Sequence, residues 1–204
     1  MSSQAGGSDP CRTVAECPEG KIEISSYNPD WRRQFDDEAG RIRAALGTAA
    51  LSIEHVGSTA VPGLAAKPVI DIHLVVADAA REMNYAPSLE SAGYKMVIRE
   101  PDWFEHRMFE GKTPRVNVHV FSKRCPEVER VRLFRDWLRQ SAEDAALYAE
   151  TKRRLAAGNW TSVQSYAHAK QDVIDEIMAR ALAWAAGRSD REDCGVARVS
   201  RRKN

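Results

Sequence analysis

The first twenty residues lack the apolar segment that a signal peptide or a membrane anchor requires; they contain Ser, Gly, Pro and charged residues instead. We therefore predict a disordered tail over residues 1–20. Cysteine is also scarce, and its four positions match neither a disulfide framework nor a zinc-binding spacing: Cys11, Cys17, Cys125 and Cys194. The simplest account of these absences is a reduced, cytoplasmic protein.

An excess of charge of one sign is lacking as well. Thirty basic residues face twenty-nine acidic ones, for a net charge of +1, which gives no electrostatic reason to expect nucleic acid or an anionic membrane as partner. A chain of 204 residues, 43% of them hydrophobic, can bury one core without requiring a second domain. We predict a single domain over residues 21–186 and a disordered basic tail over residues 187–204.

The chain does contain one dense stretch of polar groups on tight backbone, between His55 and Val76. A strand ending in Ser52–Val56 leads into Gly57-Ser58 and a turn rich in small residues, and an apolar strand over Val69–Val76 follows. Alternation along this second strand places Asp71 and His73 on one face and the aliphatic residues on the other.

An acid and an imidazole inside an aliphatic strand are costly to bury without partners. One interpretation is a hydrogen-bonded pair, Asp71 with His73, at the edge of a sheet. The other is a ligand site, because glycine at position 57 lets backbone approach a ligand closely. Ser58 could cap the short helical turn that follows, so that its hydroxyl and nearby N–H groups face an anion.

The remaining elements follow from periodicity and turn residues. A first helix is expected from Asn28-Pro29 to Gly47, and a second over Ala79–Ala92 with Pro87 in its middle. Three later strands complete a sheet of about five, namely Tyr94–Arg99, Trp103–Phe109 and Arg115–Phe121. From Pro126 onward the period is helical, including Ala145–Leu155 and Val163–Ala186, and short loops favour antiparallel packing against or beside the sheet.

Charged residues in the helical half are interpreted mostly as solvated faces: Arg130, Arg132, Arg135, Arg139, Lys152, Arg153 and Arg154. Lys170 is a stronger candidate for a functional role, because it lies in a segment that resembles a block of a known family, with Tyr166 one turn earlier on the same helical face. In the strand over Arg115–Phe121, alternation places Asn117 and His119 on one face.

The segment over residues 56–72 closely resembles the GrpB family within the nucleotidyltransferase superfamily; it reads V-G-S-T-A-V-P-G-L-A-A-K-P-V-I-D-I. Later blocks agree in order: E-H-R-M-F at 105–109, N-V-H-V-F at 117–121, L-F-R-D-W-L-R at 133–139, and Y-A-x-A-K at 166–170. The resemblance covers about residues 21–186. It implies an α+β fold, with a nucleotidyltransferase-like mixed sheet of about five strands and a helical C-terminal part.

The resemblance also implies site residues. The superfamily holds two Mg²⁺ ions with three carboxylates, the third on the strand beside the acid-x-acid strand. Here that strand offers only Asn117 and His119, of which we favour His119. Asp71, His73 and His119 are thus the predicted catalytic and metal-binding residues. One carboxylate with two imidazoles suits a single Zn²⁺ or Mn²⁺ ion, or another ion that accepts imidazole, better than two Mg²⁺ ions. The predicted cofactor is a divalent metal, with Mg²⁺, Mn²⁺ and Zn²⁺ as candidates.

Three functions are compatible with these residues. In the first, a nucleotidyltransferase-like enzyme binds a nucleotide or another phosphate-bearing small molecule through six residues: Gly57, Ser58, Lys67, Arg107, Asn117 and Lys170. In the second, an enzyme of another class reuses the cleft for single-metal or histidine acid–base chemistry. In the third, the domain binds a nucleotide or coenzyme without turnover.

Overall fold

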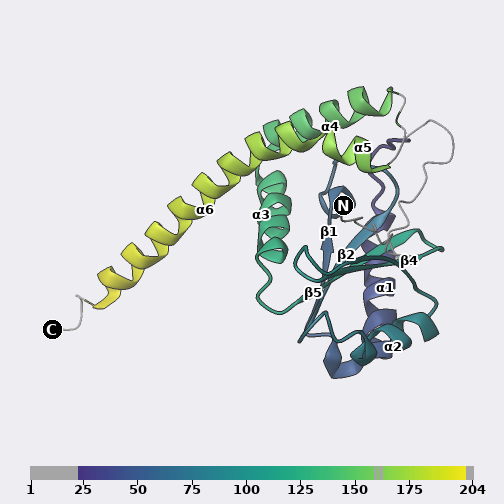
Figure 1. Ribbon diagram of the computed structural model, residues 1–204. Coiled ribbons are helices and arrows are strands. Elements are labelled where there is room, and N and C mark those ends of the chain that lie inside the picture. Colours follow the sequence, from purple (N-terminus) through teal and green to yellow (C-terminus); the bar gives the residue numbers. More distant parts are fainter. Residues whose placement is uncertain (1–22, 159, 161–162, 201–204) are drawn as a thin grey trace, which may run out of the picture.

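The computed structural model describes residues 23–158, 160 and 163–200; the tail predicted over residues 1–20 lies outside them. The helices of this part are α1 (Asp30–Leu46), α2 (Ala86–Ser91), α3 (Pro126–Gln140), α4 (Ala142–Ala156), α5 (Val163–His168) and α6 (Gln171–Ser200). A five-stranded sheet lies at the centre, with α1 and α2 against one face and α3 against the other, while α4, α5 and the start of α6 gather at one end (Figure 1).

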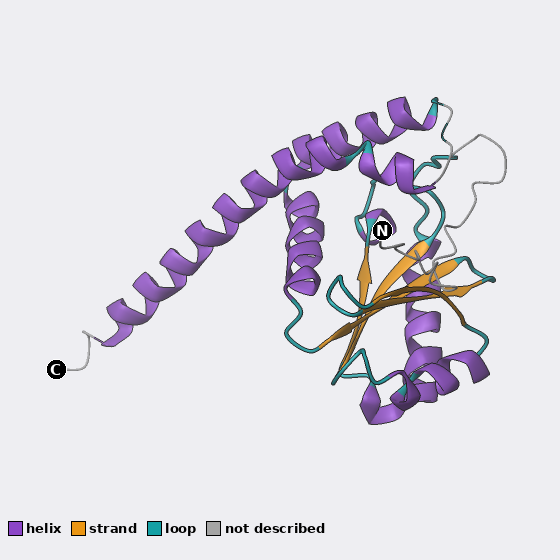
Figure 2. Ribbon diagram, viewed as in Figure 1, coloured by secondary structure: helices purple, strands orange, loops and turns teal. Residues whose placement is uncertain are grey.

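The sheet contains β1 (Ser52–Val56), β2 (Ile70–Val76), β3 (Lys95–Glu100), β4 (His106–Gly111) and β5 (Val116–Ser122). Its order is β1-β2-β5-β4-β3, with β2 and β5 parallel and the other neighbours antiparallel. Figure 2 shows the strands lying between helices on either side. The predicted α+β class, a mixed sheet of five strands followed by a helical C-terminal part, is confirmed.

The two central strands separate an aliphatic face from a polar one. Ile72 and Leu74 of β2 are fully buried and pack in the same core as Trp31 and Ile42 of α1. On the opposite face, Asp71 is paired in register with Asn117 and His73 with His119, as the alternation of the two strands predicts. The sheet thus presents its polar side chains towards α3 and the C-terminal helices.

Helix α1 begins and ends where the sequence indicates. The Asn28 side-chain oxygen accepts a hydrogen bond of 3.0 Å from the backbone N–H of Asp30, satisfying one of the donors that a helix leaves free at its start. Gly47 ends the helix with φ +54°, a conformation that glycine adopts without a steric penalty.

Two predicted elements are wrong in extent. Ala79–Ala92 is not one helix, because the chain forms a short 3₁₀ turn over Glu82–Asn84 (η3) and α2 begins only at Ala86. Pro87 lies in the first turn of α2, the position where its missing N–H costs least. The strand predicted from Trp103 begins instead at His106, because Phe104 adopts a left-handed conformation, with φ 53°.

The C-terminal helices form a second core on the β1–β2 connection. Ser141 caps α4 by accepting from the backbone N–H of Asp144 at 3.2 Å. The core joins this connection to α3, α4 and α6 through Val61, Leu64, Leu138, Tyr148, Ala149, Val173 and Ile177. Of the two predicted arrangements, against the sheet or beside it, this core corresponds to packing beside the sheet, on the connection between two of its strands.

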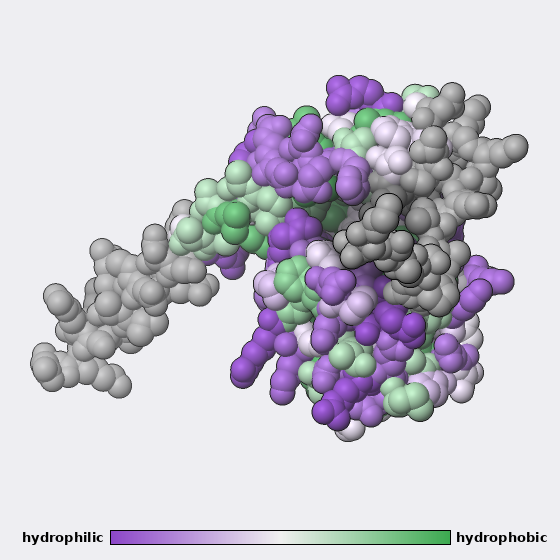
Figure 3. Space-filling model, in the orientation of Figure 1, coloured by the Kyte–Doolittle hydropathy of each residue, from purple (hydrophilic) through white to green (hydrophobic). Residues whose placement is uncertain are grey.

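Helix α6 leaves the body of the molecule after this core (Figure 1). It is described as far as Ser200, past the boundary predicted at residue 186, and residues 201–204 lie outside the described part. Figure 3 shows hydrophobic side chains gathered where α6 emerges, and Leu182 is 57% exposed. No helix of the described residues is long and apolar enough to cross a membrane.

Candidate functional site

The site begins at the turn that follows β1. Gly57 has φ +69°, and a Cβ atom at this position would lie 2.5 Å from the Asp71 Oδ2 atom. Any larger residue would therefore have to displace the Asp71 carboxylate as well as strain its own backbone. Glycine at position 57 is required here because it lets the β1–β2 connection pass directly over Asp71.

Ser58, the first residue of a short 3₁₀ turn over Ser58–Ala60 (η2), does not cap that turn. Its Oγ atom instead accepts a hydrogen bond of 2.9 Å from the Lys152 Nζ atom of α4. The same Nζ atom donates to the backbone oxygen of Ala65 at 2.5 Å and lies 4.6 Å from the centroid of the Tyr148 ring. Lys152, interpreted from the sequence as part of a solvated helix face, thus lies behind the Gly57-Ser58 turn.

Lys152 is a buried cation without a carboxylate partner. Its residue is 3% exposed, and among the residues that the structure describes no carboxylate forms an ion pair with it; its two hydrogen-bond partners are neutral. Burial, reinforced by the positive charges of Lys170 and Arg153, lowers the pKa of Lys152 to about 7. The lysine therefore changes charge close to neutral pH.

Asp71 lies beside Gly57 and is held from the neighbouring strand. The Asn117 Nδ2 atom donates to Asp71 Oδ1 at 3.0 Å, and the His119 Nε2 atom lies 4.0 Å from the same oxygen. Burial opposes ionisation of this carboxyl, but His119, Asn117 and the charge of Lys170 together hold its pKa below the ordinary value. Asp71 is thus a carboxylate at neutral pH.

Two side chains that the sequence did not identify as candidates, His106 and Glu100, lie behind His119. The His119 Nδ1 and His106 Nε2 atoms are 3.0 Å apart, and His106 Nδ1 lies 2.8 Å from Glu100 Oε2. If Glu100 accepts a hydrogen bond from His106 Nδ1, His106 Nε2 is free to accept one from His119 Nδ1. The other ring nitrogen of His119, Nε2, is the one that faces Asp71. His106 lies within the E-H-R-M-F block, and alternation in that block puts it on the face of His119, which is the signal that could have identified it.

His73 is nearly enclosed on the same sheet face. It is 5% exposed, its Nδ1 atom has no hydrogen-bond partner among the residues that the structure describes, and its ring packs edge-on against Phe121 with centroids 5.2 Å apart. Burial, together with the neighbouring His119, lowers the pKa of His73 to about 3, so its imidazole is neutral. Asp71 and His73 share a face but do not form the direct hydrogen-bonded pair that was one of the two interpretations.

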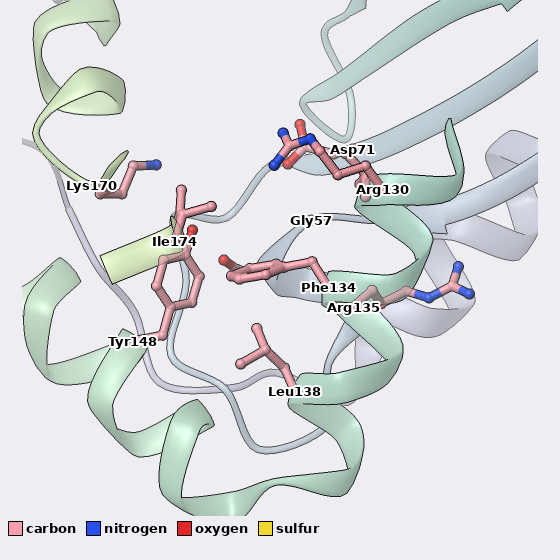
Figure 4. A pocket seen from close by; sticks show the side chains of 11 residues that line it. Gly57, Asp71, Arg130, Phe134, Arg135, Leu138, Tyr148, Lys170 and Ile174 are labelled. Atoms are coloured by element: carbon pink, nitrogen blue, oxygen red, sulfur yellow. The ribbon is translucent and has the colours of Figure 1, made fainter. Parts of the chain in front are cut away.

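A cavity of about 220 Å³ opens between this turn and the C-terminal helices. It is lined by Gly57, Ser58, Asp71, Arg130, Val131, Phe134, Arg135, Leu138, Tyr148, Lys170 and Ile174. Figure 4 shows the apolar side chains of Phe134, Leu138 and Ile174 together at its centre, with Lys170 reaching in from one side. The cavity is therefore apolar in part, and polar where β2 and the β1–β2 turn border it.

The other predicted cations occupy different places. Lys170 lies in the turn between α5 and α6, with its Nζ atom 4.7 Å above the Tyr166 ring, and burial lowers its pKa while Asp71 opposes that change. Lys67 lies part-buried in the β1–β2 connection, outside the cavity lining. Arg107 is on the opposite face of the sheet, where its Nε atom lies 2.5 Å from Glu82 Oε1.

Arg135 is a second charged residue that was interpreted from the sequence as part of a solvated helix face but is largely buried. Its side chain is 11% exposed and its Nη1 atom lies 3.2 Å from Glu54 Oε2 of β1. It also donates to the His55 backbone oxygen at 2.9 Å, and Figure 4 shows its guanidinium directed away from the apolar centre of the cavity. Arg135 therefore anchors α3 to the sheet beside the site.

The donor set does not fit the two Mg²⁺ ions of the superfamily pattern. Asp71 is the only carboxylate on the described cavity wall, whereas two hard ions require several. In the described part of the chain, no three His, Cys, Asp or Glu side chains are grouped closely enough to hold a metal ion. His119 Nε2 and Asp71 Oδ1, 4.0 Å apart, are the two donors that face each other.

Comparison with known proteins identifies the family. The family model described as GrpB protein matches residues 21–180. The UPF0157 protein BH1888 of Halalkalibacterium halodurans is 55% identical over 162 residues, which cover 79% of this chain and 83% of that protein. The chain belongs to the GrpB family.

A crystal structure of the GrpB protein from Enterococcus faecalis is similar in fold to this family member, with a TM-score of 0.71 and 31% sequence identity. The similarity covers 80% of this chain and 99% of that one. A crystal structure of the Cid1 poly(U) polymerase is similar over 64% of this chain and 44% of its own, with a TM-score of 0.42 and 8% identity. The family predicted from the residues is confirmed.

Proposed function

We propose that this GrpB family member is a nucleotidyltransferase-like enzyme that binds a nucleotide or another phosphate-bearing small molecule in the cavity beside Gly57-Ser58. The observation that carries the proposal is the Lys152 ammonium, which is 3% exposed and, among the described residues, has two neutral oxygens as its hydrogen-bond partners. A buried cation without a counter-charge is costly. An anion at Ser58 would supply the missing charge, since Ser58 lies between Lys152 and the cavity.

The rest of the cavity suits a ligand with a charged end and an apolar or aromatic body. Lys170 lines the cavity and is partly buried, so its charge acts on a bound anion with less screening than an exposed lysine would. Phe134, Tyr148 and Ile174 offer the apolar surface on which a base or another ring can rest. A volume of about 220 Å³ favours a compact group, such as a phosphate, inside the cavity itself.

Asp71 gives the site its asymmetry. A single carboxylate beside several cations repels a phosphate from one side, so a bound phosphate is held nearer Ser58 and Lys170. Asp71 lines the cavity, so it would orient the hydroxyl of an acceptor bound there by accepting a hydrogen bond from it. Asp71 and His119, whose Oδ1 and Nε2 atoms face each other at 4.0 Å, are the two proposed ligands of a divalent metal; His73, the third ligand predicted from the sequence, packs against Phe121.

A second candidate function is acid–base chemistry on a small molecule, with His119 as the acting group. It is favoured by the contacts from Glu100 through His106 to His119, with distances of 2.8 and 3.0 Å. Such contacts fix the tautomer and orientation of an imidazole, as a carboxylate does in a catalytic triad. In this case His119→Ala would abolish turnover and leave ligand affinity unchanged.

Ligand binding tests the proposal directly. Thermal shift and calorimetry would compare ATP, UTP, inorganic triphosphate and uncharged adenosine at pH 6.5 and 8.5. We expect both nucleotides and triphosphate to bind and adenosine to bind at least about 100-fold more weakly, a difference of about 2.7 kcal/mol. Affinity should fall from pH 6.5 to 8.5, because Lys152, whose pKa is about 7, loses its charge over that range.

Matched lysine variants identify the site. Lys152→Met and Lys170→Met should each weaken triphosphate binding by about tenfold or more. Lys95→Met, which changes an exposed lysine of β3 outside the cavity lining, should leave it unchanged. Equal losses in all three variants, or no binding of any phosphate compound by the wild type, would contradict the proposal.

A further inference from the structure

We propose that Ser58 and Lys152 form a nucleophile and general-base pair, and that a phosphoryl or nucleotidyl group is carried covalently on the Ser58 hydroxyl. The choice of a phosphorus electrophile rests on the function proposed above. The reactivity of the pair does not, because it follows from the arrangement of the two side chains. A serine that only anchors a ligand would make no bond to it.

The geometry meets the requirement for an activated serine. Ser58 Oγ and Lys152 Nζ are 2.9 Å apart, within the range over which a base can take the hydroxyl proton. The Ala65 backbone oxygen accepts another Nζ–H at 2.5 Å, and this contact fixes the direction of the amine. Ser58 lines the cavity, so its oxygen can meet an electrophile while Lys152 stays behind it, shielded from solvent.

The surroundings of Lys152 leave its amine able to accept a proton. Burial is the first cause of its low pKa, and Lys170, from the α5–α6 turn, and Arg153, from α4 itself, add to it. The Tyr148 ring of the same helix and the neutral oxygens of Ser58 and Ala65 complete the groups described around Nζ. With a pKa of about 7, a large fraction of the amine carries a free lone pair at neutral pH.

The covalent step balances without a redox partner. Ser58 Oγ attacks phosphorus while its proton moves to Lys152 Nζ, the Oγ–P bond forms, and the bond from phosphorus to the leaving group breaks. The leaving group takes the electron pair of that bond and then the proton from the Lys152 ammonium. Attack by water or by an acceptor hydroxyl on the same phosphorus reverses the sequence and releases Ser58.

Anchoring and covalent catalysis have opposite pH dependence at this pair. Phosphate binding depends on the ammonium form of Lys152, so it weakens as pH rises through about 7. Nucleophilic attack depends on the neutral amine, so it becomes faster over the same range. One titration can therefore distinguish the two roles of the same residues.

Covalent labelling provides the test. The wild-type protein would be incubated with an alkyl fluorophosphonate, whose P–F bond breaks as the Oγ–P bond forms, and analysed by intact-protein and peptide mass spectrometry. We expect one adduct, on Ser58, forming about tenfold faster at pH 8 than at pH 6, in proportion to the neutral fraction of a lysine with a pKa of about 7.

Four variants make the result specific. Ser58→Ala should abolish the adduct, and Lys152→Met should slow it at least about 100-fold, the usual contribution of a general base. Lys152→Arg keeps a cation but offers no lone pair, so it should bind triphosphate and fail to label. Ser91→Ala, an exposed serine of α2 whose hydroxyl bonds to Pro87, is the control and should label as the wild type does.

Several outcomes would overturn the inference: no adduct on the wild type, an adduct at another residue, or labelling of Lys152→Met at the wild-type rate. Thermal unfolding of each variant shows whether it is folded before its labelling rate is compared. If nucleotides do not bind but Ser58 still labels through Lys152, the proposed ligand is wrong and the reactive pair stands. If nucleotides bind but Ser58 does not label, the proposed ligand stands and the reactive pair is wrong.

Discussion

Replacing Lys152 by methionine should make the folded chain more stable at pH 6 in the absence of ligand. The wild type must keep a protonated lysine in a place that is 3% exposed, with no carboxylate described beside it. Methionine has a similar length and no charge, so the variant avoids this cost. A buried charge retained against stability is expected at a binding or catalytic site rather than in a purely structural contact.

The size of the effect follows from the pKa of Lys152, which falls from 10.5 to about 7 on folding. At about 1.4 kcal/mol per pH unit this corresponds to about 5 kcal/mol at pH 6. The variant in turn loses the bond to the Ala65 oxygen, which costs about 1–3 kcal/mol for a buried acceptor. The net gain is about 3 kcal/mol, or a rise in Tm of about 10 °C for a chain of this size.

The sign of the pH dependence is fixed. Between pH 7 and 10.5 the unfolded lysine holds its proton while the folded one releases it, so wild-type stability rises with pH relative to the variant. At pH 9 the difference should have fallen to about zero. Urea unfolding of wild type, Lys152→Met and the exposed-site control Lys95→Met at pH 6, 7.5 and 9 measures it. A loss of stability in Lys152→Met that is the same at all three pH values would refute the reasoning.

Three further predictions concern Gly57, Asp144 and the binding of a metal ion. Gly57→Ala should lower the free energy of unfolding by about 1–3 kcal/mol, because the new Cβ atom meets Asp71 Oδ2 at 2.5 Å and the φ of +69° disfavours alanine; a denaturation curve equal to that of the control Gly40→Ala, where a Cβ atom meets nothing within 4 Å, would contradict this. Asp144→Ala should cost about 2–3 kcal/mol at pH 7, since Asp144 is 4% exposed and accepts from Arg180 at 2.7 Å and Trp137 at 2.6 Å. Arg180, opposed by burial, lowers the pKa of Asp144 below 3.8, so its contribution should disappear as pH falls below about 4, and a difference that persists under acid conditions would disagree. For metals, calorimetry should find Mn²⁺ or Zn²⁺ bound more tightly than Mg²⁺, with a loss of at least about tenfold in Asp71→Asn and in His119→Ala; Mg²⁺ binding that both variants retain would argue against these ligands.

The polar face of the sheet was predictable because strand alternation is a local rule. Asp71 and His119 lie on the paired strands β2 and β5. Alternation within each strand determines which of its side chains share a face. The same rule applied to β4 separates His106 from Arg107, and this much was available from the sequence. The register of β4 with β5 then places His106 on the face of His119 and Arg107 on the opposite face, where it pairs with Glu82.

Lys152 could not have been found in the same way. The spacing of charges on a helix shows that they share a face, but not what covers that face. Lys152 is buried because α4 packs against the β1–β2 connection, 94 residues earlier in the chain than the lysine itself. The predicted extent of the second helix was wrong for a local reason. Pro87 lies in the first turn of α2 and marks its start, whereas the prediction placed it in the middle of a longer helix.

The same separation of 94 residues between Ser58 and Lys152 sets the order in which the site can appear during synthesis. The sheet is complete once Ser122 has left the ribosome, and its strands can then pair. Ser58 and Asp71 are present at that stage, but Lys152 and Lys170 are not. Until the last helices are synthesised and dock, the Gly57-Ser58 turn and Asp71 lack the two lysines described beside them, so the binding and the reactivity proposed for Ser58 both depend on the C-terminal part of the chain.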